Sequence, residues 1–367
     1  MRLLYFTHSL RSCWNHGNAH FTRGLLRELQ ANSHDAQALE PEDSWSYRNL
    51  VADQGVSASA AFDRQFPSLS SKTYTRSADL SSFIDGADIV IVHEWNEPWL
   101  IAALGRMRRH SSRFVLLFHD THHRAISDPA ALRSFDLSEY DGVLAFGEAL
   151  AKVYRRRGWG RQVHVWHEAA DTRLFRPPSI EGARAGLVWI GNWGDNERSE
   201  ELRSYLLEPA RDLGMPLDVH GVRYPPEALA SLKAHGARYL GWIANAEVPG
   251  CFAKYLATVH VPRRFYAEEL PGIPTIRVFE ALACGIPLVS APWQDSEGLF
   301  KPGEDYLVAR SSEEMRKHLA ALIREPALRQ ALVGHGLDTI RAKHSCAHRM
   351  NQLLTIVDEI RTPVLAP

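Results

Sequence analysis

Short apolar runs alternate along this chain with stretches that have the spacing of amphipathic helices. The apolar runs cover residues 3–7, 87–92, 114–118, 142–146, 163–166, 187–190, 217–222 and 257–261. They have the length of buried strands, whereas residues 40–80 are polar and predict only a weak helix between irregular loops. Strands that alternate with helices form a parallel sheet, which binds ligands at the carboxyl ends of its strands. The sequence therefore predicts an α/β fold with a site at such an edge.

The strand and helix pattern is expected to build two domains. A chain of 367 residues is long enough for two domains of ordinary size. Residues 173–185 contain two adjacent prolines and end in small side chains, which is typical of a linker, and the pattern restarts after them. We expect two Rossmann-like domains with doubly wound parallel sheets that face a cleft, at residues 1–176 and 177–345. A last segment, residues 346–367, begins with a helix that carries an apolar stripe.

Composition and charge exclude several classes of protein. The chain is 45% hydrophobic and 23% charged, and its net charge of −1 provides no bulk basic surface for nucleic acid. Its four cysteines lack the spacing of a metal site or a disulfide framework, which is typical of a reducing compartment. No window approaches about 18 apolar residues, and the apolar run at the N-terminus is too short for a signal peptide. We therefore expect a cytoplasmic protein without a membrane span.

The stretch at residues 272–290 has the clearest local signature. It indicates a loop, a short helix that is capped by Thr275 and ended by Gly285, and a buried strand. Arg277 and Glu280 share one face of this helix, opposite an apolar stripe. A cation, a carboxylate and a helix N-terminus suit a ligand with phosphate and hydroxyl groups. The alternative is an exposed ion pair, which would contribute only ~0.3–0.5 kcal/mol.

Three histidines of the first half, His8, His93 and His119, stand where predicted strands end. Because the carboxyl ends of parallel strands meet at one edge of a sheet, we expect these side chains to line a site. The residues that follow the second and third of these strands are also polar or aromatic. They include Glu94, Trp95, Asp120, His122 and His123.

Two other kinds of site are disfavoured. A zinc site of His119, His122 and His123 with Asp120 would crowd all its ligands into one loop without a distant partner. A Rossmann dehydrogenase is disfavoured because the first loop lacks the G-x-G-x-x-G fingerprint. We expect neither a bound metal nor a dinucleotide cofactor.

The second half of the chain carries a series of motifs in a fixed order. They are Gly191-Asn192, Leu240-Gly241-Trp242-Ile243, Gly272-Ile273-Pro274 leading into Phe279-Glu280-Ala281-Leu282-Ala283-Cys284-Gly285-Ile286-Pro287-Leu288-Val289, and Gly303-Glu304-Asp305-Tyr306-Leu307-Val308. In this order they resemble the group 1 glycosyltransferases of the GT-B fold. Arg277, three residues before Glu280, looks most like the spore-maturation CgeB-like branch. In the first half, Gly17, His20 and the segment Asp171–Pro177 are similar to the same family.

The resemblance implies a hexosyltransferase or related enzyme whose second domain binds a nucleoside diphosphate sugar, of the UDP type, as co-substrate. Glu280 matches the second glutamate of the family's E-x7-E motif, which is expected on the ribose hydroxyls. Gly272 takes the place of the first glutamate, which lies near the donor sugar in the family, and Glu268 and Glu269 are close in sequence. Carried over by position, the donor-binding residues are Gly191, Asn192, Asn196, Arg198, Trp242, Ile243, Gly272, Ile273, Pro274, Thr275, Arg277 and Glu280. The family also implies that the terminal helix packs back on the first domain.

The first domain is then expected to bind the acceptor, which is a carbohydrate, a protein or a small molecule. The acceptor-binding candidates are His20, His93, Glu94, Trp95, His122 and His123. The catalytic candidates are His119, Asp120 and His16, with the first two favoured because a general base must face the cleft. A metal is not expected, since helix N-termini and arginine can neutralise phosphates. Two alternatives remain open: a nucleotide-sugar 2-epimerase or hydrolase on the same fold, and a non-catalytic protein that binds nucleotide sugars.

Overall fold

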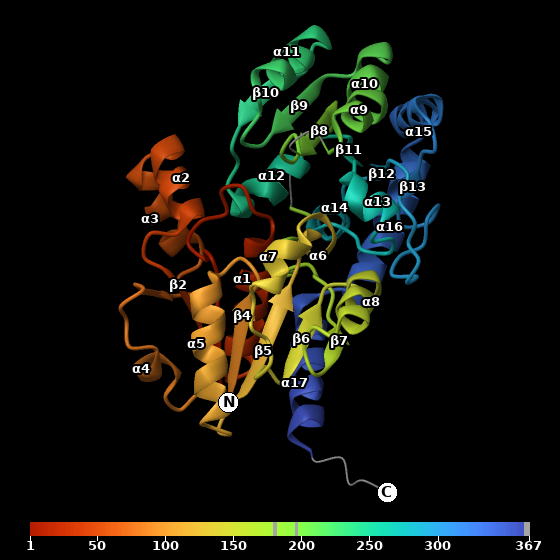
Figure 1. Cartoon of the computed structure of the whole chain (residues 1–367). Helices are drawn as coiled ribbons and strands as arrows, with labels where there is room; N and C mark the ends of the chain where they lie inside the picture. Colours follow the sequence, from red (N-terminus) through yellow and green to blue (C-terminus); the bar gives the residue numbers. More distant parts are fainter. Residues whose placement is uncertain (179–181, 195–196, 363–367) are drawn as a thin grey trace, which may run out of the picture. The chain divides into compact units, whose positions relative to one another are not determined.

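The computed structural model describes residues 1–178, 182–194 and 197–362 and divides into two compact units. Unit 1 contains Met1–Glu168 together with the chain from Cys346 onward, and unit 2 contains Ala169–Ser345. Each unit is one parallel sheet with helices packed on it, which confirms the predicted fold class (Figure 1). Ala170 and Ser345 form an isolated parallel bridge, so the chain enters and leaves unit 2 at neighbouring points.

Unit 1 is built on a sheet of seven strands in the order β3-β2-β1-β4-β5-β6-β7, and every neighbouring pair is parallel. The strands are β1 (Arg2–Phe6), β2 (Asp35–Pro41), β3 (Ser71–Tyr74), β4 (Ile89–His93), β5 (Val115–Asp120), β6 (Gly142–Ala145) and β7 (Val163–Val165). The chain runs outward from β1 in one direction through β2 and then in the other through β4. The direction therefore reverses between β1 and β4, which makes this pair the topological switch point of unit 1.

The helices of unit 1 cover both faces of its sheet. They are α1 (Asn18–Ala31), α2 (Trp45–Gln54), α3 (Val56–Gln65), α4 (Leu80–Ile84), α5 (Pro98–Arg109), α6 (Arg124–Ser127), α7 (Pro129–Arg133), α8 (Glu148–Arg157) and α17 (Cys346–Arg361). Right-handed crossovers that run in opposite directions along a sheet place their helices on opposite faces, here α1 on one and α5 and α8 on the other. The terminal helix α17 packs against α1 (Figure 1).

Hydrogen bonds join α17 to the end of the first segment of unit 1. Trp166 Nε1 donates to Arg349 O at 2.9 Å, and Arg349 Nε donates to His167 O at 2.9 Å. Gln352 Nε2 donates to Val165 O at 2.9 Å. The residues after Ser345 therefore complete the core of unit 1, although more than 170 residues of chain separate the partners in the sequence.

The prediction of a single weak helix within residues 40–80 is wrong. This segment contains the end of β2, the helices α2 and α3, the strand β3 and the start of α4. Polar side chains hid the strands: Glu40 lies in β2, and β3 has the sequence Ser-Lys-Thr-Tyr at the edge of the sheet. Glu40 is fully buried because Ser9 Oγ and Arg11 Nε bind its carboxylate at 2.9 and 2.6 Å. Pairing with β1, rather than local propensity, makes β2 a strand.

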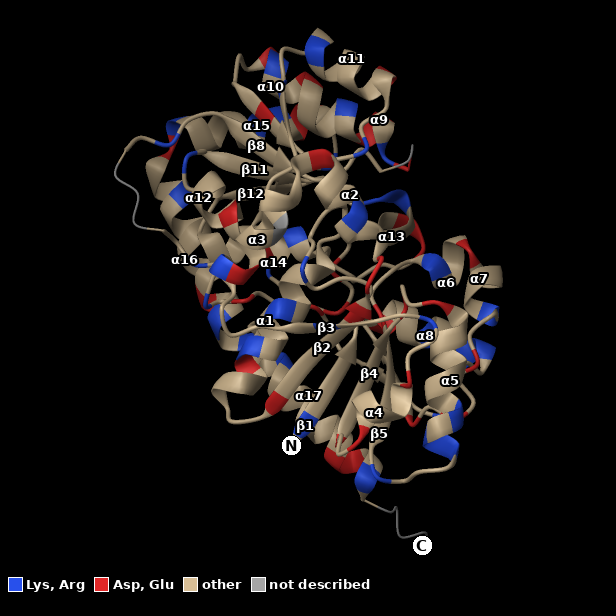
Figure 2. Ribbon diagram, turned by 90° about the vertical axis from the view of Figure 1, so that its left-hand side faces the viewer, with Lys and Arg blue, Asp and Glu red and all other residues tan. Residues whose placement is uncertain are grey.

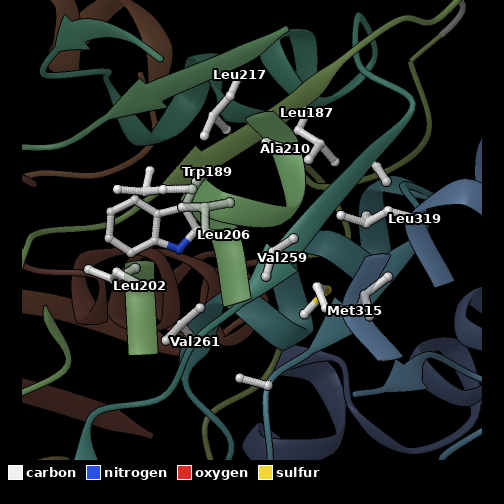
Figure 3. Packing of buried hydrophobic residues seen from close by; sticks show 14 of the residues in the cluster. Leu187, Trp189, Leu202, Leu206, Ala210, Leu217, Val259, Val261, Met315 and Leu319 are labelled. Carbon is white, nitrogen blue, oxygen red and sulfur yellow. The ribbon is translucent and has the colours of Figure 1, made fainter. Parts of the chain in front are cut away.

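Unit 2 has a sheet of six strands in the order β10-β9-β8-β11-β12-β13, again with every pair parallel. The strands are β8 (Leu187–Ile190), β9 (Leu217–His220), β10 (Arg238–Gly241), β11 (Ala257–His260), β12 (Leu288–Ser290) and β13 (Leu307–Val308). The switch point of this sheet lies between β8 and β11. Its core packs strand residues such as Leu187 and Val259 against helix residues such as Leu206 and Met315 (Figure 3).

The helical segments of unit 2 follow the predicted pattern with one irregularity. They are α9 (Ser199–Leu202), η1 (Arg203–Leu207), α10 (Glu208–Asp212), α11 (Pro226–Ala234), η2 (Asn245–Glu247), α12 (Val248–Phe252), α13 (Arg264–Glu268), α14 (Ile276–Cys284), α15 (Ser312–Arg324) and α16 (Pro326–Lys343). The helical run from Ser199 to Asp212 contains the π-helical turn η1, in which Glu208 N–H bonds to Arg203 O five residues back. Pro209 follows at once and has no N–H for an ordinary helical bond.

Two helix boundaries of unit 2 have a clear chemical cause. Glu314 N–H donates to Ser311 Oγ at 3.1 Å at the start of α15, as the Ser-x-x-Glu pattern predicts. Gly285 ends α14 in the left-handed conformation, with φ of 63°.

Acidic and basic side chains are interspersed over the ribbon of each unit, in keeping with the net charge of −1 (Figure 2). Among the described residues, no helix is long and apolar enough to cross a membrane.

Candidate functional site

The switch point of unit 2 is bridged by one guanidinium group. Arg198 NH2 donates to Asn192 O, just past β8, at 2.6 Å, and Arg198 NH1 donates to Val261 O, just past β11, at 2.7 Å. Its Nε has no hydrogen-bond partner within the described ranges, and no described carboxylate forms an ion pair with it. The loops that leave the two central strands are thus held together by a cation that forms no ion pair with a carboxylate of the described residues, although the charge of Glu197 acts on it.

Two further arginines lie near this guanidinium. The pKa of Arg198 is lowered to about 10, chiefly by burial and also by the positive charges of Arg263 and Arg277, while Tyr224 and Glu197 raise it. Arg263 forms an ion pair with Glu197 at 3.2 Å. The pKa of the buried His260, the last residue of β11, falls to about 3 because of its burial and the charge of Arg198. The carboxyl ends of β8 and β11 therefore bring together three guanidinium groups, two of which form ion pairs with glutamates.

The helix α14 begins beside this region with an N-terminus that no side chain caps. Its N-cap is Thr275, as predicted, but the Thr275 side chain makes no capping hydrogen bond. Glu280 lies one turn further on and is 0% exposed. Its Oε1 accepts a hydrogen bond from Asn245 Nδ2 at 2.9 Å, and its Oε2 forms an ion pair with Arg277. The alternative of an exposed ion pair is therefore wrong, because the carboxylate is buried within unit 2.

The other residues expected at the donor site lie at three places in unit 2, namely just past β8, just past the edge strand β10 and in the loop before α14. Gly191 accepts a hydrogen bond from Tyr224 OH at 2.8 Å, and Asn192 Oδ1 accepts one from Val222 N–H at 3.0 Å. Trp242 and Ile243 are half-buried, and Trp242 Nε1 has no partner within the described part of the chain. Asn196 lies outside the described residues. Gly272, Ile273, Pro274 and Thr275 form the loop before α14, in which Gly272 has a φ of 93°.

Histidines gather at the switch point of unit 1, as predicted from the strand ends. The ring of His8 lies 4.1 Å from that of His16 and 5.5 Å from that of His93, centroid to centroid. The rings of His93 and His119 are 5.7 Å apart. Burial lowers the pKa of all four, to about 4 for His8 and about 3 for His119. All four imidazoles are therefore neutral at neutral pH. Among the described residues, no group of histidine, cysteine and acidic side chains has the geometry of a metal site.

The expectation that His119 and Asp120 are open to an acceptor is wrong, since both are 0% exposed. His119 Nδ1 lies 2.6 Å from Tyr5 OH. The His119 ring packs edge-on against the ring of Trp166. Asp120 accepts hydrogen bonds from Tyr154 OH at 2.7 Å and from the backbone N–H of His122 at 2.9 Å. Both residues belong to β5, in which every residue from Val115 to Asp120 is buried.

Glu94 and Asp120 form a buried acidic pair. Burial raises the pKa of Glu94 well above its usual value, and the charge of Asp120 raises it further, while Arg124 lowers it from 3.6 Å away. Burial raises the pKa of Asp120 to about 6, although the hydrogen bonds from Tyr154 and from the backbone of His122 lower it. The two carboxyl groups titrate together, and the pair holds a proton more readily than separate carboxyl groups would.

One aromatic side chain of this rim is open to solvent. Trp95 is 43% exposed, with the Arg124 guanidinium 4.5 Å from its ring centroid and the His122 ring 5.1 Å away. His122 and His16 are half-buried. The other candidates for the acceptor side are buried: His20, His93, Glu94 and His123 are 0–2% exposed. Of these candidates, Trp95, His122 and His16 are therefore the ones with solvent-accessible surface, although His16 Nδ1 is buried.

Sequence reasoning missed several residues of these regions. His260 is the last residue of β11, as His93 is of β4, and Arg263 comes shortly after it. The expectation that ligand-binding residues lie at the carboxyl ends of strands was therefore sufficient to find them. Arg124 and Tyr154 come from the helices after β5 and β6, and only the fold brings them to Glu94 and Asp120. No sequence signal marks these two contacts.

Comparison with known sequences finds two matching families, one for each half of the chain. Residues 17–174 match the family described as Glycosyltransferase Family 4, and residues 198–355 match the family described as Glycosyl transferase-like. None of the curated proteins matches the chain significantly.

Many solved structures share the fold along nearly the whole chain. HepE of Anabaena, solved in complex with UDP and glucose, is 14% identical with a TM-score of 0.69, covering 98% of this chain and 99% of its own. Sucrose-phosphate synthase of Thermosynechococcus elongatus is 13% identical with a TM-score of 0.66, covering 98% and 99%. The T4 phage protein BGT, in complex with its UDP-glucose substrate, is 11% identical with a TM-score of 0.61, covering 98% and 100%. The solved structures show that the chain has the GT-B fold, and the two family matches, one in each half, place it among the group 1 glycosyltransferases, related to glycosyltransferase family 4.

Proposed function

We propose that this enzyme transfers a sugar from a UDP-type nucleotide sugar to a carbohydrate, protein or small-molecule acceptor, without a metal ion. The observation that carries the proposal is the Arg198 guanidinium at the switch point of unit 2, which lacks a carboxylate partner among the described residues. A cation that is largely buried and unpaired is costly, and a diphosphate would compensate its charge. The uncapped N-terminus of α14 favours the same anion.

Glu280, whose carboxylate is 0% exposed and paired with Arg277, is proposed to bind the ribose of the donor only after Arg277 releases it. A carboxylate oxygen accepts more than one hydrogen bond, which suits two neighbouring hydroxyl groups. Asn245 and Arg277 hold this carboxylate in place, and we propose that Arg277 exchanges it for the diphosphate when the donor binds. The UDP bound by HepE and the UDP-glucose bound by T4 BGT support a uridine donor here.

Metal independence is supported by the charge of this region. Arg198, Arg263 and Arg277 lie close enough for the second and third to lower the pKa of the first. Fixed cations of this kind stabilise the negative charge that develops on a leaving diphosphate, which a metal ion does in other enzymes. We also propose that the chain belongs to the CgeB-like branch, which it resembles in having an arginine three residues before the glutamate. The ion pair of Arg277 with Glu280 gives this spacing a structural role and so supports the assignment.

Unit 1 is proposed to bind the acceptor through Trp95, His122 and His16. An exposed tryptophan backed by a guanidinium is a rigid surface on which a sugar ring can stack. Of the three catalytic candidates, His16 is the one with partial exposure, and its Nε2 donates to Ser12 O at 2.7 Å. Its other ring nitrogen, Nδ1, is then free of a proton, but this atom is buried, so we propose that His16 orients the rim through its exposed edge rather than by taking a proton. His119 and Asp120 are proposed to position this rim rather than to touch the acceptor.

Incubation with a panel of nucleotide sugars, with and without sugar acceptors, tests the proposed function. The proposal predicts a product that forms only when both a UDP-sugar and an acceptor are present, with the same rate in excess chelator. An epimer or a free sugar formed at full rate without acceptor would contradict it and support an epimerase or hydrolase. A protein that binds nucleotide sugars but forms no product would support the non-catalytic alternative.

A further inference from the structure

The loop before α14 contains a glycine that no other residue can replace without strain. Gly272 has a φ of 93°, a conformation that side chains disfavour. A Cβ atom at this position would lie 2.3 Å from Ser296 Oγ, far inside van der Waals contact. A carboxylate therefore cannot be supplied from position 272 itself.

A carboxylate from elsewhere in unit 2 occupies the space beside this glycine. The same Cβ position lies 3.2 Å from Glu297 Cγ and 3.3 Å from Glu297 Oε1. A side chain at position 272 would thus enter the place that the Glu297 side chain already fills. Glu297 is half-buried, so its carboxylate lies at the surface of the loop rather than in the core.

The segment that carries Glu297 is fixed to the loop by hydrogen bonds. Ser296 Oγ donates to Pro271 O at 3.1 Å, directly before the glycine. The Asp295 carboxylate accepts hydrogen bonds from the N–H groups of Leu299 at 3.0 Å and Phe300 at 2.7 Å, which closes the turn around Glu297. The position of Glu297 beside Gly272 is therefore built into the fold.

We propose that Glu297 binds hydroxyl groups of the donor sugar. This inference rests on the proposed function, in which the N-terminus of α14 holds the diphosphate and Glu280 holds the ribose. The sugar then extends from the diphosphate on the side away from Glu280, toward the start of the loop, where Gly272 and Glu297 lie. A carboxylate accepts short, charge-assisted hydrogen bonds from sugar hydroxyls, and its position selects which hydroxyls are bound.

The carboxylates nearest to Gly272 in the sequence do not share this arrangement. Glu268 ends α13 and Glu269 follows it, and both side chains are exposed. Neither lies among the three nearest atoms around the Gly272 Cβ position, all of which belong to Ser296 and Glu297. They serve as matched controls, because they carry the same charge near the same loop.

The test compares the binding of UDP with that of UDP-glucose, UDP-galactose and UDP-N-acetylglucosamine by titration calorimetry. We expect Glu297→Gln to leave UDP affinity within about 2-fold and to weaken binding of the preferred UDP-sugar about 10-fold, since charge-assisted hydrogen bonds are lost. Glu269→Gln should change neither affinity. Glu297→Asp keeps the charge and should recover part of the preference for the UDP-sugar over UDP.

Equal affinities of wild type and Glu297→Gln for the UDP-sugar would overturn this assignment while leaving the proposed function intact. Equal weakening of UDP and of the UDP-sugar by Glu297→Gln would also overturn it, because the residue would then act only by shaping the loop. Absence of UDP binding to the wild type would instead overturn the proposed function and this assignment together.

Discussion

Arg198 donates a hydrogen bond of 2.7 Å to the carbonyl oxygen of Val261, and this bond closes the switch point of unit 2. The same guanidinium binds the carbonyl of Asn192, so one side chain fixes the loops that leave the two central strands. Both partners are neutral carbonyl groups, and no carboxylate of the described residues forms an ion pair with this guanidinium. Structural support and anion binding are thus combined in one residue.

Replacing Arg198 by glutamine should weaken UDP binding about 10- to 100-fold, because a charge-assisted contact to the diphosphate is worth about 1.5–3 kcal/mol. Uridine, which lacks the phosphates, should bind both proteins equally in the same calorimetric titration. Arg264→Gln is the control, since Arg264 lies next to Arg263 but pairs with Glu201 at 3.2 Å on an exposed surface. Unchanged UDP affinity in Arg198→Gln would rule out this guanidinium as a phosphate ligand.

The buried His119 should make unit 1 less stable in acid. Its pKa is about 3 in the folded protein against 6.5 for an exposed histidine, so the unfolded chain binds more protons below pH 6.5 and folding weakens as the pH falls. At pH 5 this one group costs about 2 kcal/mol. Asp120, with its pKa raised to about 6, acts in the opposite direction and partly offsets the loss.

A variant isolates the contribution of His119. The change in free energy of unfolding between pH 7.5 and pH 5.0 should be smaller in His119→Gln than in the wild type by about 2 kcal/mol, since glutamine binds no proton. The Asp120 term is present in both proteins and cancels in the comparison. Identical pH dependence of urea unfolding in the two proteins would show that His119 is already protonated, or not buried, in the native state.

Tyr154→Phe should destabilise unit 1 more at pH 8 than at pH 5. The Tyr154 hydroxyl donates to the buried Asp120 carboxylate at 2.7 Å, and its loss leaves a charged acceptor unpaired, at a cost of about 1–3 kcal/mol. The hydrogen bond lowers the pKa of Asp120, so its removal raises that pKa further, and at pH 5 the carboxyl group is protonated and needs less support. Tyr239→Phe removes an exposed hydroxyl that binds Gly221 O at 2.8 Å and is the control. A destabilisation independent of pH would contradict a charged Asp120.

Trp95→Ala should raise the KM for a sugar acceptor about 10-fold with little change in kcat or in UDP affinity, because stacking on an aromatic ring contributes about 1 kcal/mol or more. The acceptor is the one that the wild type selects from a panel of methyl glycosides. Trp45→Ala is the matched control, since Trp45 is 48% exposed on α2. If the two variants have the same acceptor KM, the stacking role of Trp95 is wrong.

Local pattern was sufficient for much of the fold. The strands β4 and β5 and the helix α14 are continuous apolar or amphipathic segments with strong ends, such as Gly285, and their boundaries follow from residues within them. By contrast, β2 becomes a strand through pairing with β1, and β3 through pairing with β2, and their polar side chains hide both strands. Elements that depend on distant partners cannot be found from local spacing.

The candidate site divides in the same way. The strand-end rule placed His8, His93 and His119 together, because the direction of parallel strands fixes where their ends meet. Spacing did not determine the exposure of a side chain. It did not decide whether Glu280 is buried or exposed, and it predicted a His119 that faces the acceptor, whereas both side chains are buried. Glu297 comes from a turn that returns to the glycine loop, and only the folded chain shows that contact.

The most direct test of the account is the affinity of Glu280→Gln for UDP and for dUDP, which lacks the ribose 2′-hydroxyl. The wild type should bind UDP about 10-fold more tightly than dUDP, because a carboxylate hydrogen bond to the hydroxyl is lost with dUDP. Glu280→Gln should bind the two nucleotides equally, whereas Glu247→Gln, an exposed change in η2, should keep the wild-type preference. A Glu280→Gln variant that still prefers UDP over dUDP as strongly as the wild type would contradict the assignment of the donor site to α14.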